Sequence, residues 1–163
     1  MNIKKGIGLS IVLIALDQFI KLIIYNWGMD KNIKLIGDII YFSPVFNKSI
    51  SWISAKTGLN FSLGAHIVFT LMIIVWFIIL GKKHYYKYLN KRYMVLAYWI
   101  TLSGMICSAI DRIFWGTSLD YICIKGFFIF DLKDILVDAI YILAIGIIIN
   151  EVENEKRSKL GSD

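Results

Sequence analysis

The chain carries several aspartates just before and within a strongly apolar stretch towards its C-terminal end. The segment 118–149 contains Asp120, Asp131, Asp134 and Asp138. An ionisable residue inside a membrane costs about 2.5–3.5 kcal/mol on insertion scales, so such residues usually mark a functional site. Two carboxylates held close in a half-dry site can perform aspartic catalysis, because like charges push their pKa values apart. The ionised aspartate would deprotonate a water, and the protonated one would donate to a carbonyl oxygen.

We predict that Asp120, in a loop, and Asp134, in the first turn of a helix, form this pair. The connecting segment can fold back, and the helix dipole favours an anion at Asp134. Asp131 could be the N-cap of that helix. Asp131, Asp134 and Asp138 would share one face, where like charges at i, i+4 repel, so some of them should meet Lys or Arg.

The spacing Asp134-x-x-x-Asp138 also resembles the metal-binding acid pairs of membrane phosphotransferases. Those enzymes add a second, Gly-containing acidic motif, which this sequence lacks. His66 and His84 are more typical of interfacial side chains than of ligands, and the two cysteines have no CxxC spacing. We therefore predict no metal and no cofactor.

Further polar residues would lie near the same face of the membrane. Asp17 and Lys21 are spaced i, i+4 with the acid first, which favours an ion pair that could also be purely structural. Asn47 lies in an outer segment. The pair Asp111-Arg112 follows an apolar run and could simply end a helix at the interface.

Four apolar runs must position these residues. The 163 residues are 58% hydrophobic, with a mean hydropathy of +0.66, whereas soluble domains are nearer half apolar. Helices are predicted at about 7–27, 62–80, 93–113 and 132–149, each long enough to cross about 30 Å of hydrocarbon. The first begins like a signal peptide but lacks a cleavage site. The prediction is a single all-α integral membrane domain over residues 1–163.

The segment 28–61 differs from these runs. Short β-branched and aromatic stretches are broken by Gly37-Asp38 and by Pro44, which predicts two or three short strands on the outer surface. In the third run, small residues between 103 and 109 would allow close helix packing.

The net charge of +6 could indicate nucleic-acid binding, but the positions of Lys and Arg along the chain are more typical of membrane topology. The segments 1–5, 82–92 and 155–159 hold ten Lys or Arg, while the longer segments 28–60 and 112–133 hold seven. The positive-inside rule then predicts both termini in the cytoplasm and the polar cluster on the outer face.

Five short stretches, in order, resemble the lipoprotein signal peptidases (signal peptidase II). "LDQFIK" is similar to Asp-Gln-x-x-Lys, and "FNKSISWIS" to Asn-x-Gly-Ala-Ala-Phe-Ser. "CSAIDRI" is similar to Gly-Asn-x-x-Asp-Arg, "SLDYI" to Val-x-Asp-Phe, and "FDLKDI" to Phe-Asn-x-Ala-Asp. The resemblance covers nearly the whole chain, and its strength lies in the ordered set.

The resemblance implies a membrane aspartic endopeptidase of the bacterial cytoplasmic membrane. It would remove the signal peptide from prolipoproteins whose Cys carries diacylglycerol, with substrate and membrane lipid as partners, no nucleic acid, and a monomeric state. The implied catalytic residues are Asp120 and Asp134. The residues implied to hold substrate are Asn47, Asp111 and Arg112, and those implied to support the site are Asp17, Lys21, Ser108 and Asp131.

The sequence departs from the family pattern at several positions. Ser49 replaces Gly, residues 50–52 replace Ala-Ala-Phe, Cys107-Ser108 replaces Gly-Asn, Asp131 replaces Asn, and Lys133 replaces Ala. Asp131 could add negative charge to the pair, and Lys133 could compensate. The alternative is therefore a catalytically altered or inactive paralogue that binds lipoproteins. A small transporter is less favoured, because the second run carries no ionisable residue except His66 at its edge.

Overall fold

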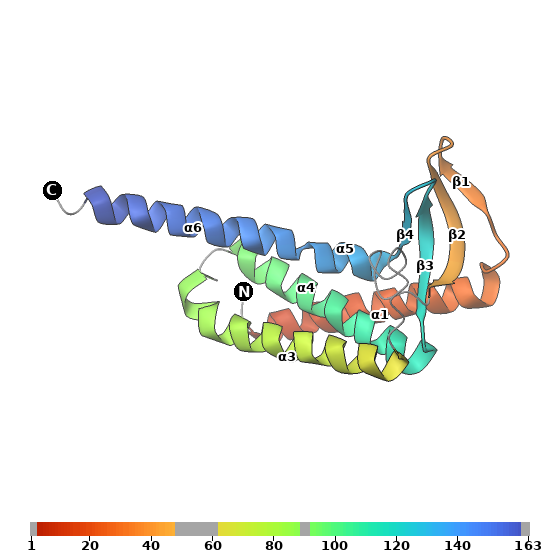
Figure 1. The fold of residues 1–163 in the computed structure, drawn as a ribbon, viewed down its shortest axis with the longest axis horizontal. Helices are drawn as coiled ribbons and strands as arrows, with labels where there is room; N and C mark the ends of the chain where they lie inside the picture. Colours follow the sequence, from red (N-terminus) through yellow and green to blue (C-terminus); the bar gives the residue numbers. More distant parts are fainter. Residues whose placement is uncertain (1–2, 48–61, 89–91, 161–163) are drawn as a thin grey trace.

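The computed structural model describes residues 3–47, 62–88 and 92–160. Helices run roughly side by side, and a small sheet stands across one end of them (Figure 1). Both chain ends lie towards the opposite end (Figure 1). The elements in chain order are α1 (Ile3–Trp27), β1 (Ile33–Ile36), β2 (Ile40–Asn47), α3 (Leu63–Tyr88), α4 (Arg92–Ile110), the π-helical turn η1 (Asp111–Trp115), β3 (Ser118–Ile124), β4 (Phe128–Phe130), α5 (Leu132–Asp138) and α6 (Ile140–Leu160).

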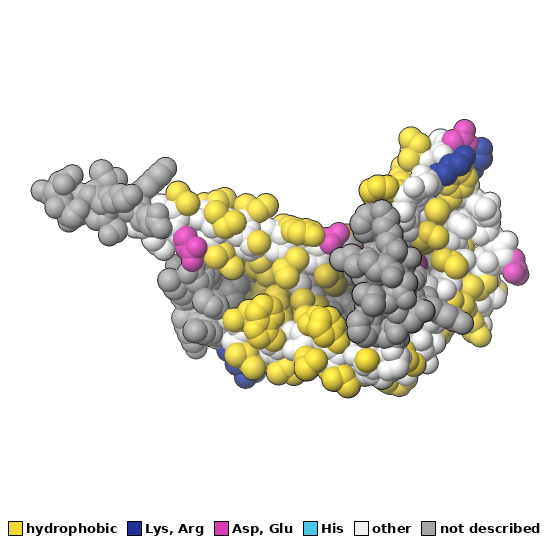
Figure 2. Space-filling model, in the orientation of Figure 1, with side chains coloured by type: hydrophobic (Ala, Val, Ile, Leu, Met, Phe, Trp, Pro, Cys, Tyr) yellow, Lys and Arg dark blue, Asp and Glu magenta, His cyan; other side chains and the backbone are white. Residues whose placement is uncertain are grey.

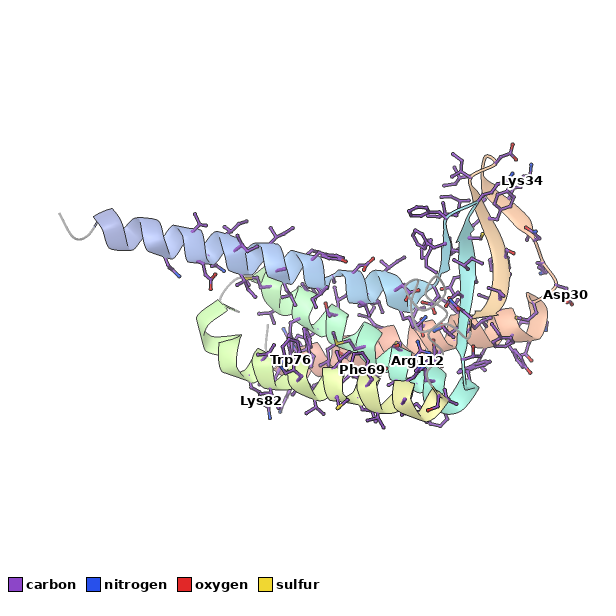
Figure 3. All side chains as sticks on the ribbon, in the orientation of Figure 1. Asp30, Lys34, Phe69, Trp76, Lys82 and Arg112 are labelled. Carbon is purple, nitrogen blue, oxygen red and sulfur yellow. The ribbon has the colours of Figure 1, made fainter. Side chains whose placement is uncertain are left out.

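Four stretches are long and apolar enough to cross a membrane, as predicted. They are Ile3–Trp27, Leu63–Lys82, Arg92–Trp115 and Leu132–Val152. Their outward faces are apolar: Phe19 on α1, Trp76 on α3 and Ile145 on α6 are all exposed. Figure 2 shows hydrophobic side chains over the helices, with charged groups mainly towards the two ends. Figure 3 places Lys82 at one end and Lys34 at the other.

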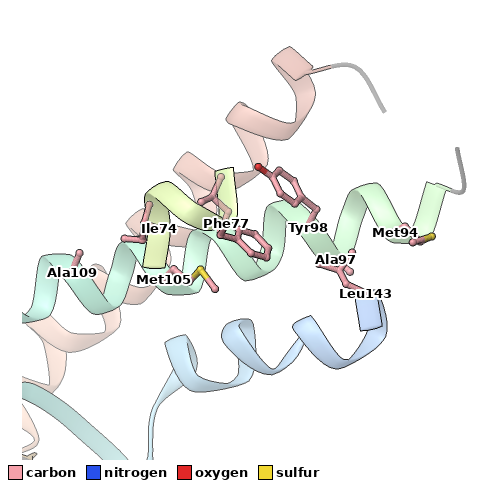
Figure 4. Close-up of a cluster of buried hydrophobic side chains, with 9 residues drawn as sticks. Ile74, Phe77, Met94, Ala97, Tyr98, Met105, Ala109 and Leu143 are labelled. Carbon is pink, nitrogen blue, oxygen red and sulfur yellow. The ribbon is translucent and has the colours of Figure 1, made fainter. Parts of the chain in front are cut away.

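The helix α4 is the centre of the bundle. In the membrane-crossing part of α4, 61% of the residues are buried, compared with 17–22% in the other three spans. Most of the α4 surface therefore contacts protein, whereas most of the surface of the other spans faces outward. Figure 4 shows the apolar cluster along it, where Phe77 of α3 stacks on Tyr98 with ring centroids 5.0 Å apart. Leu143 of α6 closes the same cluster from the other side.

The four strands form one antiparallel sheet in the order β1-β2-β3-β4. In the β2–β3 register, Val45 lies opposite Asp120, and Asn47 opposite Ser118. The predicted mostly helical fold with a small β region is found, and β1 and β2 lie within the predicted segment 28–61. The sheet is larger than predicted, because β3 and β4 come from the connection between α4 and α5, where a loop was expected. A third strand predicted within 28–61 would fall largely in 48–61, outside the described residues.

Candidate active site

The start of α5 is fixed by a reciprocal pair of hydrogen bonds. The Asp131 side chain accepts from the Asp134 backbone N–H at 3.3 Å, and the Asp134 side chain accepts from the Asp131 backbone N–H at 3.1 Å. This capping box satisfies two backbone donors that a helix start leaves unpaired. The predicted N-cap role of Asp131 is confirmed. The same bonds fix the orientation of the Asp134 carboxyl group.

A glycine lets α5 approach α4 closely. A Cβ built on Gly104 would lie 2.7 Å from the Val137 backbone nitrogen and 2.8 Å from the Lys133 carbonyl oxygen. Any larger residue would push α5 outward and move Asp134 with it. The predicted close packing of the third membrane helix is confirmed at this position.

Asp120 lies in β3, not in the predicted loop. It pairs with Val45 of β2, and its side chain is 4% exposed. Ser118 donates to Asp120 Oδ1 at 2.6 Å, and Asn47 donates to Asp120 Oδ2 at 2.8 Å. Strand pairing therefore brings a serine and an asparagine onto the same carboxylate.

A buried tyrosine joins β3 to the start of α5. The Tyr121 hydroxyl accepts a hydrogen bond from the Leu132 backbone N–H at 3.2 Å. Burial raises the pKa of Tyr121 to about 12, so the hydroxyl is neutral. This contact links the strand that carries Asp120 to the helix that carries Asp134.

These elements bring the two predicted catalytic aspartates together. Carboxylate oxygens of Asp120, Asp131 and Asp134 all lie within 4.8 Å of one another. The side chain of Asp134 is 45% exposed, whereas that of Asp120 is almost fully buried. Asp138, one turn deeper, is exposed and is not part of this group of carboxylates.

Two lysines lie among the aspartates and offset part of their negative charge. The Lys21 side chain is fully buried, and its ammonium lies 2.9 Å from Asp17, 2.6 Å from Asp111 and 2.7 Å from Asp131. The predicted Asp17–Lys21 ion pair is thus present, and it belongs to a larger network. Gln18 extends this network by donating to Asp111 Oδ1 at 3.1 Å.

The second lysine is Lys133, a departure from the family pattern that the sequence analysis expected could compensate the charge of Asp131. Its side chain is 6% exposed, and its ammonium lies 2.7 Å from Asp131, 3.3 Å from Asp120, 3.6 Å from Asp111 and 3.7 Å from Asp134. The available signal was its position between two acids at a helix start. Three carboxylates this close could attract a metal ion; here an ammonium group supplies positive charge among them.

Asp131 lies 2.7 Å from the ammonium group of each lysine. Burial alone would raise its pKa, but Lys133 and Lys21 together hold the pKa of Asp131 below its ordinary value. Asp131 is therefore a charged residue inside the network as well as the N-cap of α5.

Two predicted site residues stand apart from this network. Arg112 is buried in η1, close enough to His66 to act on it electrostatically, and lies towards the sheet end of the bundle (Figure 3). Ser108 is half-buried on α4. Among the described residues, neither forms a hydrogen bond or ion pair with the carboxylate cluster. The departures at Ser49 and 50–52 lie outside the described residues.

Comparison with known proteins decides the family. The model of the Signal peptidase (SPase) II family matches residues 9–150. The chain belongs to the signal peptidase II family. This result confirms the resemblance in the motifs, and it assigns the chain to the membrane proteases that process lipoprotein signal peptides.

Other relatives of this signal peptidase II family member are consistent with that assignment. The chain is 26% identical over 125 residues to a lipoprotein signal peptidase of Halothermothrix orenii, covering 76% of this chain and 81% of the relative. Its fold is similar to two solved structures of a bacterial membrane enzyme. One has a TM-score of 0.68 at 20% identity, covering 95% of this chain and 92% of the other. The second has a TM-score of 0.69 at 21% identity, covering 90% and 92%.

Proposed function

We propose that this protein is an aspartic endopeptidase that removes the signal peptide from prolipoproteins carrying a diacylglyceryl-modified Cys. The observation that carries the proposal is the approach of Asp120 and Asp134, from β3 and α5, to within 4.8 Å at the sheet end of the membrane helices. Family membership supports the substrate class, and the pair of neighbouring aspartates supports the chemistry.

The surroundings of the two carboxyl groups differ, which suggests a division of roles. Asp120 receives hydrogen bonds from Ser118, Asn47 and Lys133, and donors of this kind favour an ionised carboxylate. Asp134 is more exposed, and among the described residues its side chain accepts a hydrogen bond only from the Asp131 backbone N–H. We therefore assign Asp120 as the general base and Asp134 as the residue that carries the proton.

In this mechanism Asp120 removes a proton from a water, and the water oxygen attacks the carbonyl carbon of the peptide bond preceding the modified Cys. Asp134 gives its proton to the carbonyl oxygen, so no free oxyanion forms. The intermediate collapses when the C–N bond breaks. The proton on Asp120 passes to the leaving amine, and Asp134 recovers a proton from the new hydroxyl group, which restores both residues.

The predicted substrate residues need separate treatment in this proposal. Asn47 and Asp111 both bind groups of the protein, so we propose that they hold the cluster in place. Arg112 stays a predicted substrate residue. It makes no ion pair with the carboxylates among the described residues, which leaves its charge available to a substrate.

The proposed orientation places the sheet and the aspartates on the outer side of the bacterial cytoplasmic membrane. Its support is the excess of Lys and Arg near the termini, together with the position of both chain ends away from the sheet (Figure 1). Single cysteines at Lys34 and Lys82 test it, in a background in which Cys107 and Cys123 are replaced by alanine. An impermeant thiol reagent on intact cells should label position 34, and preferential labelling at position 82 would overturn the orientation.

The proposed activity is tested with two precursors that differ at one position. Purified protein should shorten a diacylated prolipoprotein and leave intact a precursor whose modified Cys is replaced by Ala. Equal cleavage of both precursors would indicate a general protease. Cleavage of neither by folded protein would refute the proposed activity and favour the lipoprotein-binding paralogue.

A further inference from the structure

The Lys133 ammonium occupies an unusual position between the two aspartates. It donates to Ser118 Oγ at 2.6 Å, to Asp131 Oδ2 at 2.7 Å and to Asp120 Oδ1 at 3.3 Å. An ammonium group has three hydrogens to donate, so these three acceptors use all of them. The group is therefore held in place by the protein, and its charge rather than a free N–H acts on its neighbours.

The contacts that Lys133 makes with Asp120 and with Asp134 differ in kind. Lys133 Nζ makes a hydrogen bond to Asp120 at 3.3 Å but lies 3.7 Å from Asp134, where no hydrogen bond forms. Ser118 bridges the two groups, because it accepts from Lys133 and donates to the same oxygen of Asp120. The lysine therefore binds Asp120 by direct hydrogen bonding and through Ser118, whereas it acts on Asp134 by its charge alone.

Charges from every element around Lys133 contribute to this balance. Asp120 faces it from β3, Asp111 from η1, Asp134 from α5 and Asp131 from the N-cap. On α1, Lys21 lies across the shared Asp131, 2.7 Å from its carboxylate, and it also binds Asp17. Asp131 thus holds both cations, and its own negative charge partly offsets the effect of Lys133 on the catalytic pair.

We propose that Lys133 is a positioning residue that keeps Asp120 ionised as the general base and leaves the proton on Asp134, and that Asp131 holds Lys133 in this place. This inference rests on the proposed function, because it assigns roles within the same pair. It predicts that the two charges act in opposite directions: Lys133 favours ionised Asp120, and Asp131 opposes it.

The acid limb of the pH–rate profile measures this directly, because activity falls when the general base is protonated. Removing the positive charge in Lys133→Met should move the limb upward by about 1–3 pH units, the usual effect of an opposite charge at this distance. Asp131→Asn should move it downward. The double variant should lie between the two single variants, and Lys133→Arg should stay near the wild-type limb.

A control variant separates this local effect from a change in net charge. Lys34→Met removes the same charge from an exposed ion pair with Asp38 on the outer sheet, and its acid limb should stay at the wild-type position. If the acid limb of the pH–rate profile lies at the same pH in wild type, Lys133→Met and Asp131→Asn, the proposal is refuted. If Lys133→Met fails to fold, the double variant decides, because its limb must lie above that of Asp131→Asn.

A chemical readout tests the same inference without any turnover. Dicyclohexylcarbodiimide modifies carboxyl groups that are protonated in apolar surroundings, and mass spectrometry locates the adduct. Near neutral pH Asp120 of the wild-type protein should stay unlabelled, and Lys133→Met should gain label at Asp120. Equal labelling of Asp120 in both proteins would refute the role of Lys133. If wild-type protein cleaves no diacylated precursor, the proposed function fails, while this labelling still tests the lysine.

Discussion

Replacement of Lys21 by methionine should destabilise the protein strongly, because it removes the cation that three buried carboxylates share. The ammonium lies 2.6–2.9 Å from Asp17, Asp111 and Asp131, and all four side chains are at most 1% exposed. Breaking a buried ion pair by removing one partner costs about 3–5 kcal/mol, since the remaining charge stays in a poorly solvated place. Lys133 compensates at Asp131 but makes no ion pair with Asp17 among the described residues. The loss is a large part of a total stability of about 5–15 kcal/mol.

The assay for this prediction is unfolding of purified protein in one detergent, by heat or denaturant. Lys21→Met should unfold at a much lower midpoint than wild type. Lys34→Met is the matched control, because it breaks an ion pair whose side chains are 66% and 72% exposed, and it should unfold like wild type. Adding Asp17→Asn to Lys21→Met should recover part of the loss, since one uncompensated charge is removed. A Lys21→Met midpoint equal to that of wild type would refute the view that this cation holds the helices together.

Three further predictions concern the contacts that place the aspartates. Gly104→Val should push α5 away from α4, lower stability by about 1–3 kcal/mol and slow cleavage. Gly8→Val, with open space around its Cβ, should have none of these effects. Equal unfolding midpoints for the two variants would contradict this prediction. Tyr121→Phe leaves the Leu132 N–H without its acceptor and should cost about 1 kcal/mol in thermal unfolding; an unchanged midpoint would refute the link between β3 and α5. Because the pKa of Asp131 is lowered, its contribution to stability is present above its ordinary value of 3.8 and is lost as the pH falls below that value. Acid unfolding curves should therefore be flatter for Asp131→Asn than for wild type, and parallel curves would contradict it.

The sequence predicted the parts of this protein that depend on local pattern. Apolar runs predicted the membrane helices, and the i, i+4 spacing predicted the Asp17–Lys21 pair. A helix start at Asp131 followed from its residue type and position, and the capping box confirms it. In each case the relevant partners are close in sequence, so short-range rules were enough.

Features that depend on distant partners were missed or misplaced. Asp120 was expected in a loop, and it is pairing with β2, distant in sequence, that places it in a strand. We expected some of the three aspartates at 131, 134 and 138 to meet a Lys or Arg. Asp131 and Asp134 lie near Lys133, whereas Asp138 is exposed and outside the group of carboxylates. The sequence suggested that Lys133 could compensate Asp131, but not that it would be buried, because its burial depends on acceptors from β3, η1 and α5 together.

The most direct test of the account is the cleavage rate of a diacylated prolipoprotein by carboxamide variants of the aspartates. Asp120→Asn and Asp134→Asn keep the side-chain size but remove the base or the acid, so each should abolish turnover while the protein stays inserted and folded. Asp138→Asn is the matched control, because it makes the same change at an exposed carboxylate on α5 outside the cluster, and it should retain activity. Full cleavage by either Asp120→Asn or Asp134→Asn would contradict the proposed mechanism.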